Sequence, residues 1–460
     1  MADDFDVVVI GAGPAGENAA GRCADGGLSV AIVEERLVGG ECAFWGCIPS
    51  KTLLRPGDVL AAARRVPGAA EAVTGRLDVG AAFKERNDIT SNWDDAGELP
   101  WLDDHKVALV RGHARLAGPR VVEVANDGGT RRLTARRAVV AALGSAAFVP
   151  SIDGLADARP WTNVEITEAQ AVPPRLLVLG GGTIGAEMAQ AFSRFGSAVT
   201  IVEGGPRLLA HEEPFAAEEV AAAFAAEGIS VIVSTTAARV QRDGEVSLTL
   251  SDGRVLISDE LLVAVGRRPR TADMGLDTVG MAGLAGHYLP VDDQLRVEGG
   301  DGWLYAVGDC NGRALLTHMG KYQARICGDV ILGREARDVA DAGIVPRVTF
   351  TDPQVCGVGL TEEEARAKGL PVRAVSVSTG SVAGARVAGV GIDGTSMLVV
   401  DERRRVVVGA TFTGPGIQEL LHSATVAIAG EVTLDRLWHA VPSFPTVSEV
   451  WLRLLEQYGL

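Results

Sequence analysis

The stretch Asp6-Val-Val-Val-Ile-Gly11-Ala-Gly13-Pro-Ala-Gly16 joins an apolar strand to a tight glycine turn and to the start of a helix-like segment. A second apolar strand follows and ends in Glu34. The pattern returns in Leu176-Leu-Val-Leu-Gly180-Gly-Gly182-Thr-Ile-Gly185, and Glu203 follows Gly180 at the same distance as Glu34 follows Gly11. Such glycines let the backbone approach a pyrophosphate at a helix N-terminus, and the acid accepts hydrogen bonds from a ribose. The sequence therefore predicts two dinucleotide-binding βαβ units.

A second motif, Gly39-Gly-Glu-Cys42-Ala-Phe-Trp-Gly-Cys47-Ile-Pro-Ser-Lys51, places two cysteines close together. A distorted helix start can join two sulfurs at this spacing, and a helix N-terminus with a nearby lysine stabilises the reactive thiolate. The alternatives are two buried core cysteines or half of a zinc site, but zinc needs a second ligand pair. The motif therefore favours a redox-active pair, and no metal site is expected. The other cysteines are scattered singly and are expected in the core: Cys23, Cys310, Cys327 and Cys356.

The composition is that of an ordinary globular protein, with 47% hydrophobic and 22% charged residues. A net charge of -16 argues against a general affinity for nucleic acid or for anionic membranes. No apolar run approaches the roughly 20 residues that span a bilayer, and no secretory signal precedes the strand that begins near Asp6. We therefore expect a cytoplasmic protein that binds neither nucleic acid nor membrane and keeps most of its cysteines reduced.

The first βαβ unit, the cysteine motif and the second βαβ unit, in this order, resemble the class I pyridine nucleotide-disulfide oxidoreductases. This is the family of dihydrolipoamide dehydrogenase, glutathione reductase and mercuric reductase, and the resemblance covers nearly the whole chain. It implies an enzyme in which NAD(P)H reduces FAD, the flavin reduces the disulfide and the resulting dithiol reduces a small-molecule substrate. It also implies a homodimer.

The resemblance implies an α/β fold with two Rossmann-like dinucleotide-binding domains and a C-terminal α+β dimerisation domain. Residues 1–150 would form the first part of the FAD-binding domain, and residues 151–270 the NAD(P)-binding domain. The chain would return to the FAD-binding domain over residues 271–338. Residues 339–460, where short β-like runs alternate with helical pattern and no nucleotide motif occurs, would form the dimerisation domain.

The resemblance also assigns roles to residues that match the family's motifs. Cys47 would be the flavin-proximal sulfur, and Cys42 the interchange sulfur that meets the substrate. Lys51 and Glu187 would form the ion pair beside flavin N5, where the nicotinamide stacks; a surface salt bridge is the alternative. The residues expected at FAD are Gly11, Gly13, Gly16, Glu34, Lys51, Ala114, Gly144, Asp309, Leu316, Thr317 and His318, although His318 also fits an ordinary semi-buried histidine. Those expected at NAD(P) are Gly180, Gly182, Gly185, Glu203 and Gly266.

The acid of the second unit bears on the choice of nucleotide. Glu203 would accept hydrogen bonds from the ribose hydroxyls and repel a 2′-phosphate. Relatives that use NADPH tend to place basic residues in this loop, and here Arg207 is the nearby candidate. The sequence favours NADH, with NADPH as the alternative.

The C-terminal segment departs from the family's pattern. Disulfide-reducing relatives carry a His-Pro-Thr-x-x-Glu-like signature supplied by the partner subunit, in which the histidine exchanges protons with the interchange thiol and the glutamate orients it. The corresponding stretch Ser443-Phe444-Pro445-Thr446-Val-Ser-Glu449 keeps Glu449, which we count with the catalytic residues, but has Phe444 at the histidine position. His439 is either a substitute or a structural histidine. Mercuric-reductase-like proteins use a C-terminal cysteine pair instead, and this chain ends without one.

Three functions are consistent with these motifs. The first is an NADH-dependent reductase that acts through Cys42 and Cys47 on a disulfide or dithiol substrate, non-standard because of Phe444. The second is a diaphorase-type enzyme that passes electrons from the flavin to quinones, metal ions or oxygen, which need no thiol base. The third is a redox sensor or flavin-binding interaction protein, but a sensor has no need of the Lys51 and Glu187 pair. We expect the first.

Overall fold

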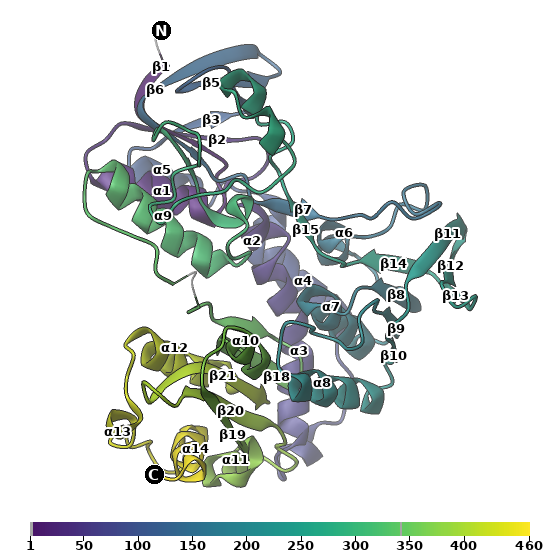
Figure 1. Ribbon diagram of the computed structural model, residues 1–460. Helices are drawn as coiled ribbons and strands as arrows, with labels where there is room; N and C mark the ends of the chain where they lie inside the picture. The colour runs from purple at the N-terminus through teal and green to yellow at the C-terminus, as the bar shows by residue number, and fades with distance from the viewer. Residues whose placement is uncertain (1–2, 341–342) are drawn as a thin grey trace. The chain divides into compact units, whose positions relative to one another are not determined.

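The computed structural model describes residues 3–340 and 343–460 (Figure 1). The chain separates into two compact units. Unit 1 contains the described residues of the segments 1–49, 85–148 and 267–341, and unit 2 those of the segments 50–84, 149–266 and 342–460. Two of the boundaries fall inside helices, which are α3 (Cys47–Arg64) and α4 (Val79–Ile89).

Unit 1 is built on a seven-stranded sheet in the order β3-β2-β1-β6-β5-β4, with β16 also paired to β6. The pairs β1/β2, β2/β3, β1/β6 and β16/β6 are parallel, whereas β4/β5 and β5/β6 are antiparallel. Val7, Val8 and Val9 are fully buried, because a parallel strand covered on both faces consists of a continuous apolar run. The strands are β1 (Asp3–Ile10), β2 (Val30–Glu34), β3 (Ala108–Arg111), β4 (His113–Leu116), β5 (Val121–Asn126), β6 (Gly129–Ala141) and β16 (Leu304–Ala306).

Helices cover this sheet, and α1 packs directly against α9 (Figure 1). Two short strands, β7 (Ser145–Ala147) and β15 (Arg267–Pro269), form an antiparallel ribbon in the same unit. The helices of unit 1 are α1 (Pro14–Asp25), α2 (Gly40–Phe44), α5 (Leu99–Asp104) and α9 (Thr317–Ile331). The 3₁₀ turns are η2 (Ser91–Trp93), η3 (Leu276–Val279), η4 (Ala282–Leu284) and η5 (Gly308–Asn311).

Unit 2 contains the second βαβ pattern as a parallel sheet in the order β10-β9-β8-β14. A three-stranded antiparallel sheet, β11-β12-β13, accompanies it. The strands are β8 (Arg175–Leu179), β9 (Ala198–Val202), β10 (Ser230–Ile232), β11 (Ala237–Asp243), β12 (Glu245–Leu250), β13 (Val255–Ser258) and β14 (Glu260–Val263). The helices here are η1 (Ala70–Ala72), α6 (Asn163–Glu168), α7 (Thr183–Arg194) and α8 (Pro214–Ala226).

The C-terminal part of unit 2 is a five-stranded antiparallel sheet in the order β17-β18-β21-β20-β19. Helix α12 packs on β18 and β21, and α14 packs on β19 and β20. The strands are β17 (Arg347–Thr349), β18 (Gln354–Gly359), β19 (Val372–Ser378), β20 (Thr395–Asp401) and β21 (Val406–Gly414). The helices are α10 (Glu362–Ala367), η6 (Thr379–Ser381), α11 (Ala383–Ala388), η7 (Ile417–Leu420), α12 (Leu421–Ala429), α13 (Leu434–Leu437), η8 (Val447–Glu449) and α14 (Val450–Tyr458). Two sheets that each contain parallel βαβ strands, together with a C-terminal α+β segment, confirm the predicted fold class.

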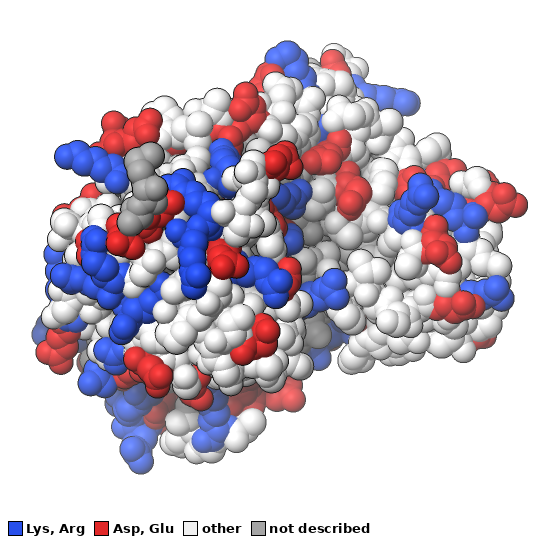
Figure 2. All heavy atoms as spheres, turned by 90° about the horizontal axis from the view of Figure 1, so that it is seen from above, with Lys and Arg blue, Asp and Glu red and all other residues white. Residues whose placement is uncertain are grey.

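The surface is of mixed charge. Figure 2 shows basic and acidic side chains interspersed over the face that it presents. Among the described residues, no helix combines the length and the apolar character that crossing a bilayer requires.

Candidate active site

The first glycine turn has a backbone that leaves no room for a side chain at two positions. Gly11 has a φ of +101°, and a Cβ on it would lie 2.4 Å from the carbonyl oxygen of Ala142. A Cβ on Gly16 would lie 1.9 Å from the carbonyl oxygen of Gly11. Gly13 is the N-cap of α1, and only Gly40 comes within 4 Å of its Cβ position, at 3.9 Å. The turn thus keeps space open at the positive end of α1, which fits the pyrophosphate of FAD.

The second turn repeats this geometry. Gly180 has a φ of +105°, and a Cβ on it would lie 2.4 Å from the carbonyl oxygen of Ala264. A Cβ on Gly185 would lie 2.0 Å from the carbonyl oxygen of Gly180. Gly182 is the N-cap of α7, and no atom of the described residues lies within 4 Å of its Cβ position. This turn fits the pyrophosphate of a second dinucleotide in the same way.

The two acids are held identically at the ends of β2 and β9. Glu34 accepts hydrogen bonds from the backbone N–H groups of Ala12 and Arg36, both at 2.8 Å. Glu203 accepts them from Gly181 and Gly205, both at 2.6 Å. Burial raises the pKa of Glu34, and its two backbone hydrogen bonds oppose that rise. Each carboxylate is therefore tied to its own turn, where the hydroxyls of a bound ribose would meet it.

The cysteine motif lies directly against the first turn. A Cβ on Gly40, the first residue of α2, would lie 2.7 Å from the Cα of Gly13. Helix α2 ends at Phe44 and α3 begins at Cys47, so the two cysteines lie on either side of a break in the helix. The pKa of the Cys42 thiol is raised by its hydrogen bond with the Cys47 sulfur and by burial, while Thr317 and Lys321 act to lower it. The two sulfurs are thus in contact, as exchange between a dithiol and a disulfide requires.

The Cys47 sulfur lies at the N-termini of two helices. Cys47 is itself the first residue of α3, and its Sγ lies 3.3 Å from Oγ1 of Thr317, the first residue of α9. The N-terminal end of a helix carries a partial positive charge, so both helices stabilise negative charge on this sulfur. Lys321, one turn further along α9, is a site residue that the sequence reasoning missed. Its spacing of four from Thr317 is a signal that could have found it.

In unit 2 the structure brings Lys51 and Glu187 together. The Lys51 Nζ lies 2.7 Å from one carboxylate oxygen of Glu187, whose side chain is only 2% exposed. The other oxygen accepts a hydrogen bond of 2.9 Å from the backbone N–H of Phe350. The Lys51 ammonium also lies 4.9 Å from the centre of the Phe350 ring. The ion pair is therefore half-buried and fixed in place, and Phe350 is a second residue that the motifs did not reveal.

Asp309 lies in unit 1 at η5, with one oxygen accepting a 2.5 Å hydrogen bond from the Ser145 hydroxyl. Burial raises the pKa of Asp309, while Ser145 and the Arg267 guanidinium act to lower it. The remaining residues expected at the cofactors are spread over several elements. Ala114 is buried on β4, Gly144 (φ +66°) precedes β7, Gly266 (φ +133°) precedes β15, Leu316 is the N-cap of α9, and His318 is exposed.

Near the C-terminus, Phe444, which stands at the family's histidine position, is exposed, whereas Glu449 has hydrogen-bonding partners. The side chain of Phe444 is 77% exposed. The Glu449 carboxylate is buried, lies 2.6 Å from the Arg453 guanidinium and accepts a long hydrogen bond of 3.4 Å from the N–H of Ala383. His439 is exposed after α13. Within this chain, Glu449 is thus held by an arginine.

Trp45, in the cysteine motif, is 5% exposed. The Arg36 guanidinium lies 3.9 Å from the centre of its ring, and the Phe44 ring lies 5.7 Å away. These contacts favour a packing role for Trp45 over a place on the wall of a substrate pocket.

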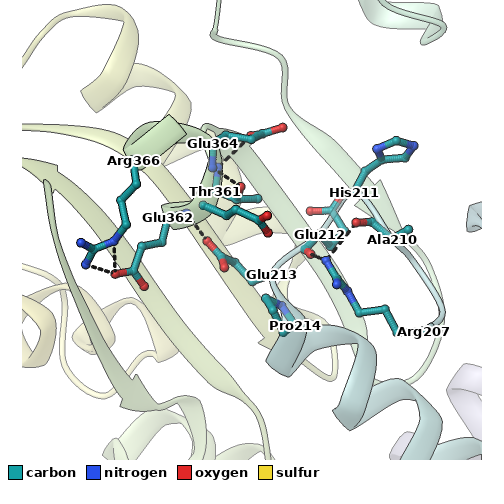
Figure 3. A pocket seen from close by; sticks show the side chains of 11 residues that line it. Arg207, Ala210, His211, Glu212, Glu213, Pro214, Thr361, Glu362, Glu364 and Arg366 are labelled. Atoms are coloured by element: carbon teal, nitrogen blue, oxygen red, sulfur yellow. Dashed lines mark hydrogen bonds and ion pairs between the residues drawn. The ribbon is translucent and has the colours of Figure 1, made fainter. Parts of the chain in front are cut away.

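A separate hollow of about 530 Å³ lies in unit 2 among acidic residues of α8, α10 and their flanking loops (Figure 3). Three of its carboxylates have partners: Glu212 pairs with Arg347, Glu213 accepts from the N–H of Glu362, and Glu362 pairs with Arg366. Within residues 3–340 and 343–460, no group of three or more histidine, cysteine or acidic side chains is arranged to hold a metal ion. We assign this hollow no ligand.

Two family profiles match the chain. The one described as pyridine nucleotide-disulphide oxidoreductase matches residues 5–324, and the one for the dimerisation domain of the same family matches residues 345–454. A dihydrolipoyl dehydrogenase of Mycobacterium tuberculosis is 33% identical over 97% of this chain and 96% of its own length. A mercuric reductase of Lysinibacillus sphaericus is 29% identical over 97% of this chain and 81% of its own length.

Solved structures agree on the fold. The HOCl-induced flavoprotein disulfide reductase RclA from Escherichia coli, solved as a Cu(II) complex, superimposes with a TM-score of 0.86 at 26% identity and covers 98% of this chain and 99% of its own. LpdA from Mycobacterium tuberculosis superimposes with a TM-score of 0.87 at 24% identity, over 99% of this chain and 100% of its own. The likeness extends over the whole architecture described above.

Proposed function

The chain belongs to the pyridine nucleotide-disulphide oxidoreductase family, and from this premise we propose that it is an NADH-dependent reductase that acts on a disulfide substrate through Cys42 and Cys47. It is an enzyme that uses FAD and NAD(P)H, and it carries the family's dimerisation domain. The observation that carries the proposal is the contact between the two cysteine sulfurs beside Thr317, at the N-termini of α3 and α9.

The residues around Cys47 are suited to hold the charge that reduction creates. When bound, FAD supplies the two-electron transfer that connects the nicotinamide to the cysteine pair. Reduction leaves one thiol and one thiolate, and the helix N-termini together with the Thr317 hydroxyl stabilise the thiolate on Cys47. Lys51, one turn along α3 from Cys47, is kept in a single orientation by Glu187. We assign this fixed ammonium to the place where the nicotinamide stacks.

The cysteine pair then passes the electrons on by thiol–disulfide exchange. The Cys42 thiol gives up its proton as its sulfur attacks one sulfur of the substrate disulfide. That S–S bond breaks, and the first substrate sulfur leaves as a thiolate that takes up this proton. Cys47 next attacks the Cys42 sulfur in the mixed disulfide, which releases the second substrate thiol and restores the Cys42–Cys47 disulfide. Each cycle delivers two electrons and two protons to the substrate, matched by one NADH and one proton from solvent.

Phe444 narrows the substrate class. Phenylalanine cannot donate a proton to a leaving thiolate, and losing a general acid–base group commonly removes a factor of about 10² to 10⁴. A disulfide whose thiols are acidic needs no such help, because a thiolate of low pKa leaves unaided. We therefore assign an apolar or aromatic disulfide with acidic thiols as the substrate, in preference to lipoamide.

NADH is the assigned nucleotide. The Glu203 carboxylate, tethered to the turn by Gly181 and Gly205, would accept hydrogen bonds from the ribose hydroxyls and would repel a 2′-phosphate. The Nη2 of Arg207 donates to the carbonyl oxygens of Ala210 and Glu212, at 3.0 and 3.3 Å (Figure 3). This arginine is therefore engaged in its own loop and is not directed at Glu203.

An anaerobic titration with NADH, combined with cysteine variants, tests the proposal. One equivalent of NADH should produce a long-wavelength charge-transfer band in the wild-type enzyme. The Cys42→Ser variant should lose at least about 10³-fold of its activity against a panel of disulfides, whereas Cys356→Ala, which removes a buried thiol in unit 2, should not. Full disulfide reductase activity in Cys42→Ser would eliminate this route. A flavin that NADH fails to bleach would favour a redox sensor.

A second candidate is a diaphorase-type reductase of quinones or metal ions. Two observations favour it: such acceptors need no thiol base, and the similar protein RclA is described as a Cu(II) complex. Quinone reduction that survives in Cys42→Ser would support this candidate. In the same assays, Phe444→His should raise lipoamide-type activity, and an unchanged rate would mean that the pocket excludes lipoamide for other reasons.

A further inference from the structure

Glu41, the residue immediately before Cys42, is held by two arginines. Its carboxylate contacts the guanidinium of Arg267 and lies 2.8 Å from that of Arg270. In unit 1 the side chains of Glu41 and Arg267 are partly buried, and that of Arg270 is exposed. Burial alone would raise the pKa of Glu41, but the two guanidinium groups outweigh it and hold that pKa below its usual value. The residue beside the cysteine is therefore a fixed negative charge.

Arg267 also links Glu41 to Ser145 and, through Ser145, to Asp309. The Nε of Arg267 donates to the Ser145 hydroxyl at 2.6 Å, and its Nη2 donates to the Ser145 carbonyl oxygen at 2.8 Å. The Ser145 hydroxyl in turn donates to Asp309. The ribbon of β7 and β15 makes this possible, because it pairs Ser145 with Pro269 and Ala147 with Arg267. The planar guanidinium, with five donors in a fixed fork, is well suited to serve a carboxylate, a hydroxyl and a carbonyl at once.

The charged groups near Cys42 form two sets. On one side Glu41 and Asp309 balance Arg267 and Arg270. On the α9 side Lys321 acts on the Cys42 thiol, as does the neighbouring sulfur of Cys47. Lys321 also acts on the carboxyl group of Glu17, which Glu98 affects in the opposite sense. Since the two acids and the two arginines of the first set balance, the loss of any one of them leaves an uncompensated charge close to the residue that carries the thiol.

We propose that Glu41 is a positioning residue for Cys42: with Arg267 and Arg270 it fixes the helix that carries this cysteine and neutralises the charge beside its sulfur. The proposal rests on the proposed function only in taking Cys42 as the sulfur that meets the substrate. It adds a determinant of thiol reactivity that the cysteine spacing does not contain.

Removing an acid and removing an arginine should shift the pKa of the Cys42 thiol in opposite directions. Glu41→Gln keeps the size of the side chain but leaves the two arginines with one acid less, which stabilises the Cys42 thiolate. Arg267→Gln leaves Glu41 and Asp309 with one cation less, which destabilises it. Neighbouring residues on a helix lie within its diameter of about 10–12 Å, and one charge at that distance, in an effective dielectric constant of about 20, shifts a pKa by about one unit. Arg267→Lys keeps the positive charge but lacks the planar guanidinium donors.

The experiment is alkylation of Cys42 by iodoacetamide across pH, in full-length flavoprotein carrying Cys47→Ser so that one site cysteine reacts. The pH at which the alkylation rate reaches half of its maximum reports the pKa of the Cys42 thiol. We expect Glu41→Gln to lower this midpoint by about one pH unit, so that alkylation near pH 7 becomes about tenfold faster. We expect Arg267→Gln to raise the midpoint by a similar amount. Arg267→Lys should shift it by only a few tenths. The double variant Cys42→Ser/Cys47→Ser gives the background from the four core cysteines.

Midpoints that shift in the same direction in Glu41→Gln and Arg267→Gln, or that do not shift at all, would overturn the proposal and leave Glu41 a purely structural residue. If Arg267→Gln fails to fold, the contrast between Glu41→Gln and Arg267→Lys still decides. Alkylation needs neither NADH nor an electron acceptor. A failure here is therefore distinguishable from a failure of the disulfide reductase assay.

Discussion

The turn at Gly11 and the turn at Gly180 have nearly the same backbone, the same open N-cap glycine and the same tethered acid. They differ in what surrounds them. In unit 1, Gly40 of the cysteine helix lies against Gly13, whereas in unit 2 no described atom lies within 4 Å of the Cβ position of Gly182. The glycine turn by itself therefore provides a site for a dinucleotide pyrophosphate. The segment that packs against the turn, which in unit 1 is the cysteine motif, distinguishes the chemistry of the two sites.

The largest expected effect comes from adding one methyl group to each turn. Gly16→Ala forces a Cβ to within 1.9 Å of the Gly11 carbonyl oxygen, and Gly185→Ala forces one to within 2.0 Å of that of Gly180. We expect the first variant to be isolated largely without FAD. The second should keep its FAD but be reduced by NADH at least about 10²-fold more slowly, because overpacking costs about 1–3 kcal/mol and displaces the phosphate. Flavin absorbance and stopped-flow reduction measure both, and stoichiometric FAD in Gly16→Ala would break the comparison.

A smaller effect is expected from Lys51→Ala. It leaves the Glu187 carboxylate buried with only the N–H of Phe350 as a partner. Removing one member of a buried pair costs about 3 kcal/mol, so thermal unfolding should begin at a lower temperature and reduction by NADH should slow by about 10². The exposed pair of Arg366 and Glu362 offers a control, since Arg366→Ala should cost at most about 1 kcal/mol. Equal losses of stability and of reduction rate in Lys51→Ala and Arg366→Ala would contradict the placement of Lys51 at the nicotinamide.

The two helices also differ at the position after the third glycine, which is Glu17 in α1 and the fully buried Ala186 in α7. Burial, with a contribution from Glu98, raises the pKa of Glu17 to about 7 from an ordinary value near 4.5. The protonated form therefore stabilises the fold, and that stability is complete below about pH 4.5 and is lost as the pH rises through 7. Glu17→Ala should remove this dependence and gain about 2 kcal/mol at pH 8 relative to pH 5. Urea unfolding at both pH values measures it, and parallel pH profiles for variant and wild type would refute it.

The smallest effect is expected at Glu34 and Glu203, the equivalent acids of the two units. Glu203→Gln should lower the preference for NADH over NADPH about tenfold, because the repulsion of a 2′-phosphate is removed. Glu34→Gln makes the same change in the first unit and should weaken FAD retention with the nucleotide preference unchanged. Steady-state kcat/KM with both nucleotides, and the FAD content after gel filtration, compare them. A change of preference in Glu34→Gln would mean that the two units are assigned the wrong way round.

Much of the site can be predicted from the sequence because its parts are local in the chain. The glycine turns, their acids and the cysteine motif each depend on backbone sterics and on hydrogen bonds within one βαβ unit or one helix start. The family resemblance, the fold class and the use of FAD and NAD(P)H are confirmed. The domain boundaries, the site roles and the preference for NADH stay predictions.

Other features could not be read from the sequence because they join distant segments. Arg267 reaches Glu41 and Ser145 only because β15 pairs with β7, and Phe350 reaches Glu187 only because β17 ends beside α7. Neither pairing leaves a periodic or spacing signal.

The sequence by itself determined that this chain builds two glycine turns with tethered acids and brings two cysteines together, since those patterns are imposed over short distances by sterics and by helix ends. Only the tertiary structure decided which charges surround Cys42 and what supports the Lys51 ammonium. Those partners come from strands and helices far away in the chain, and they are brought together by packing of the whole unit.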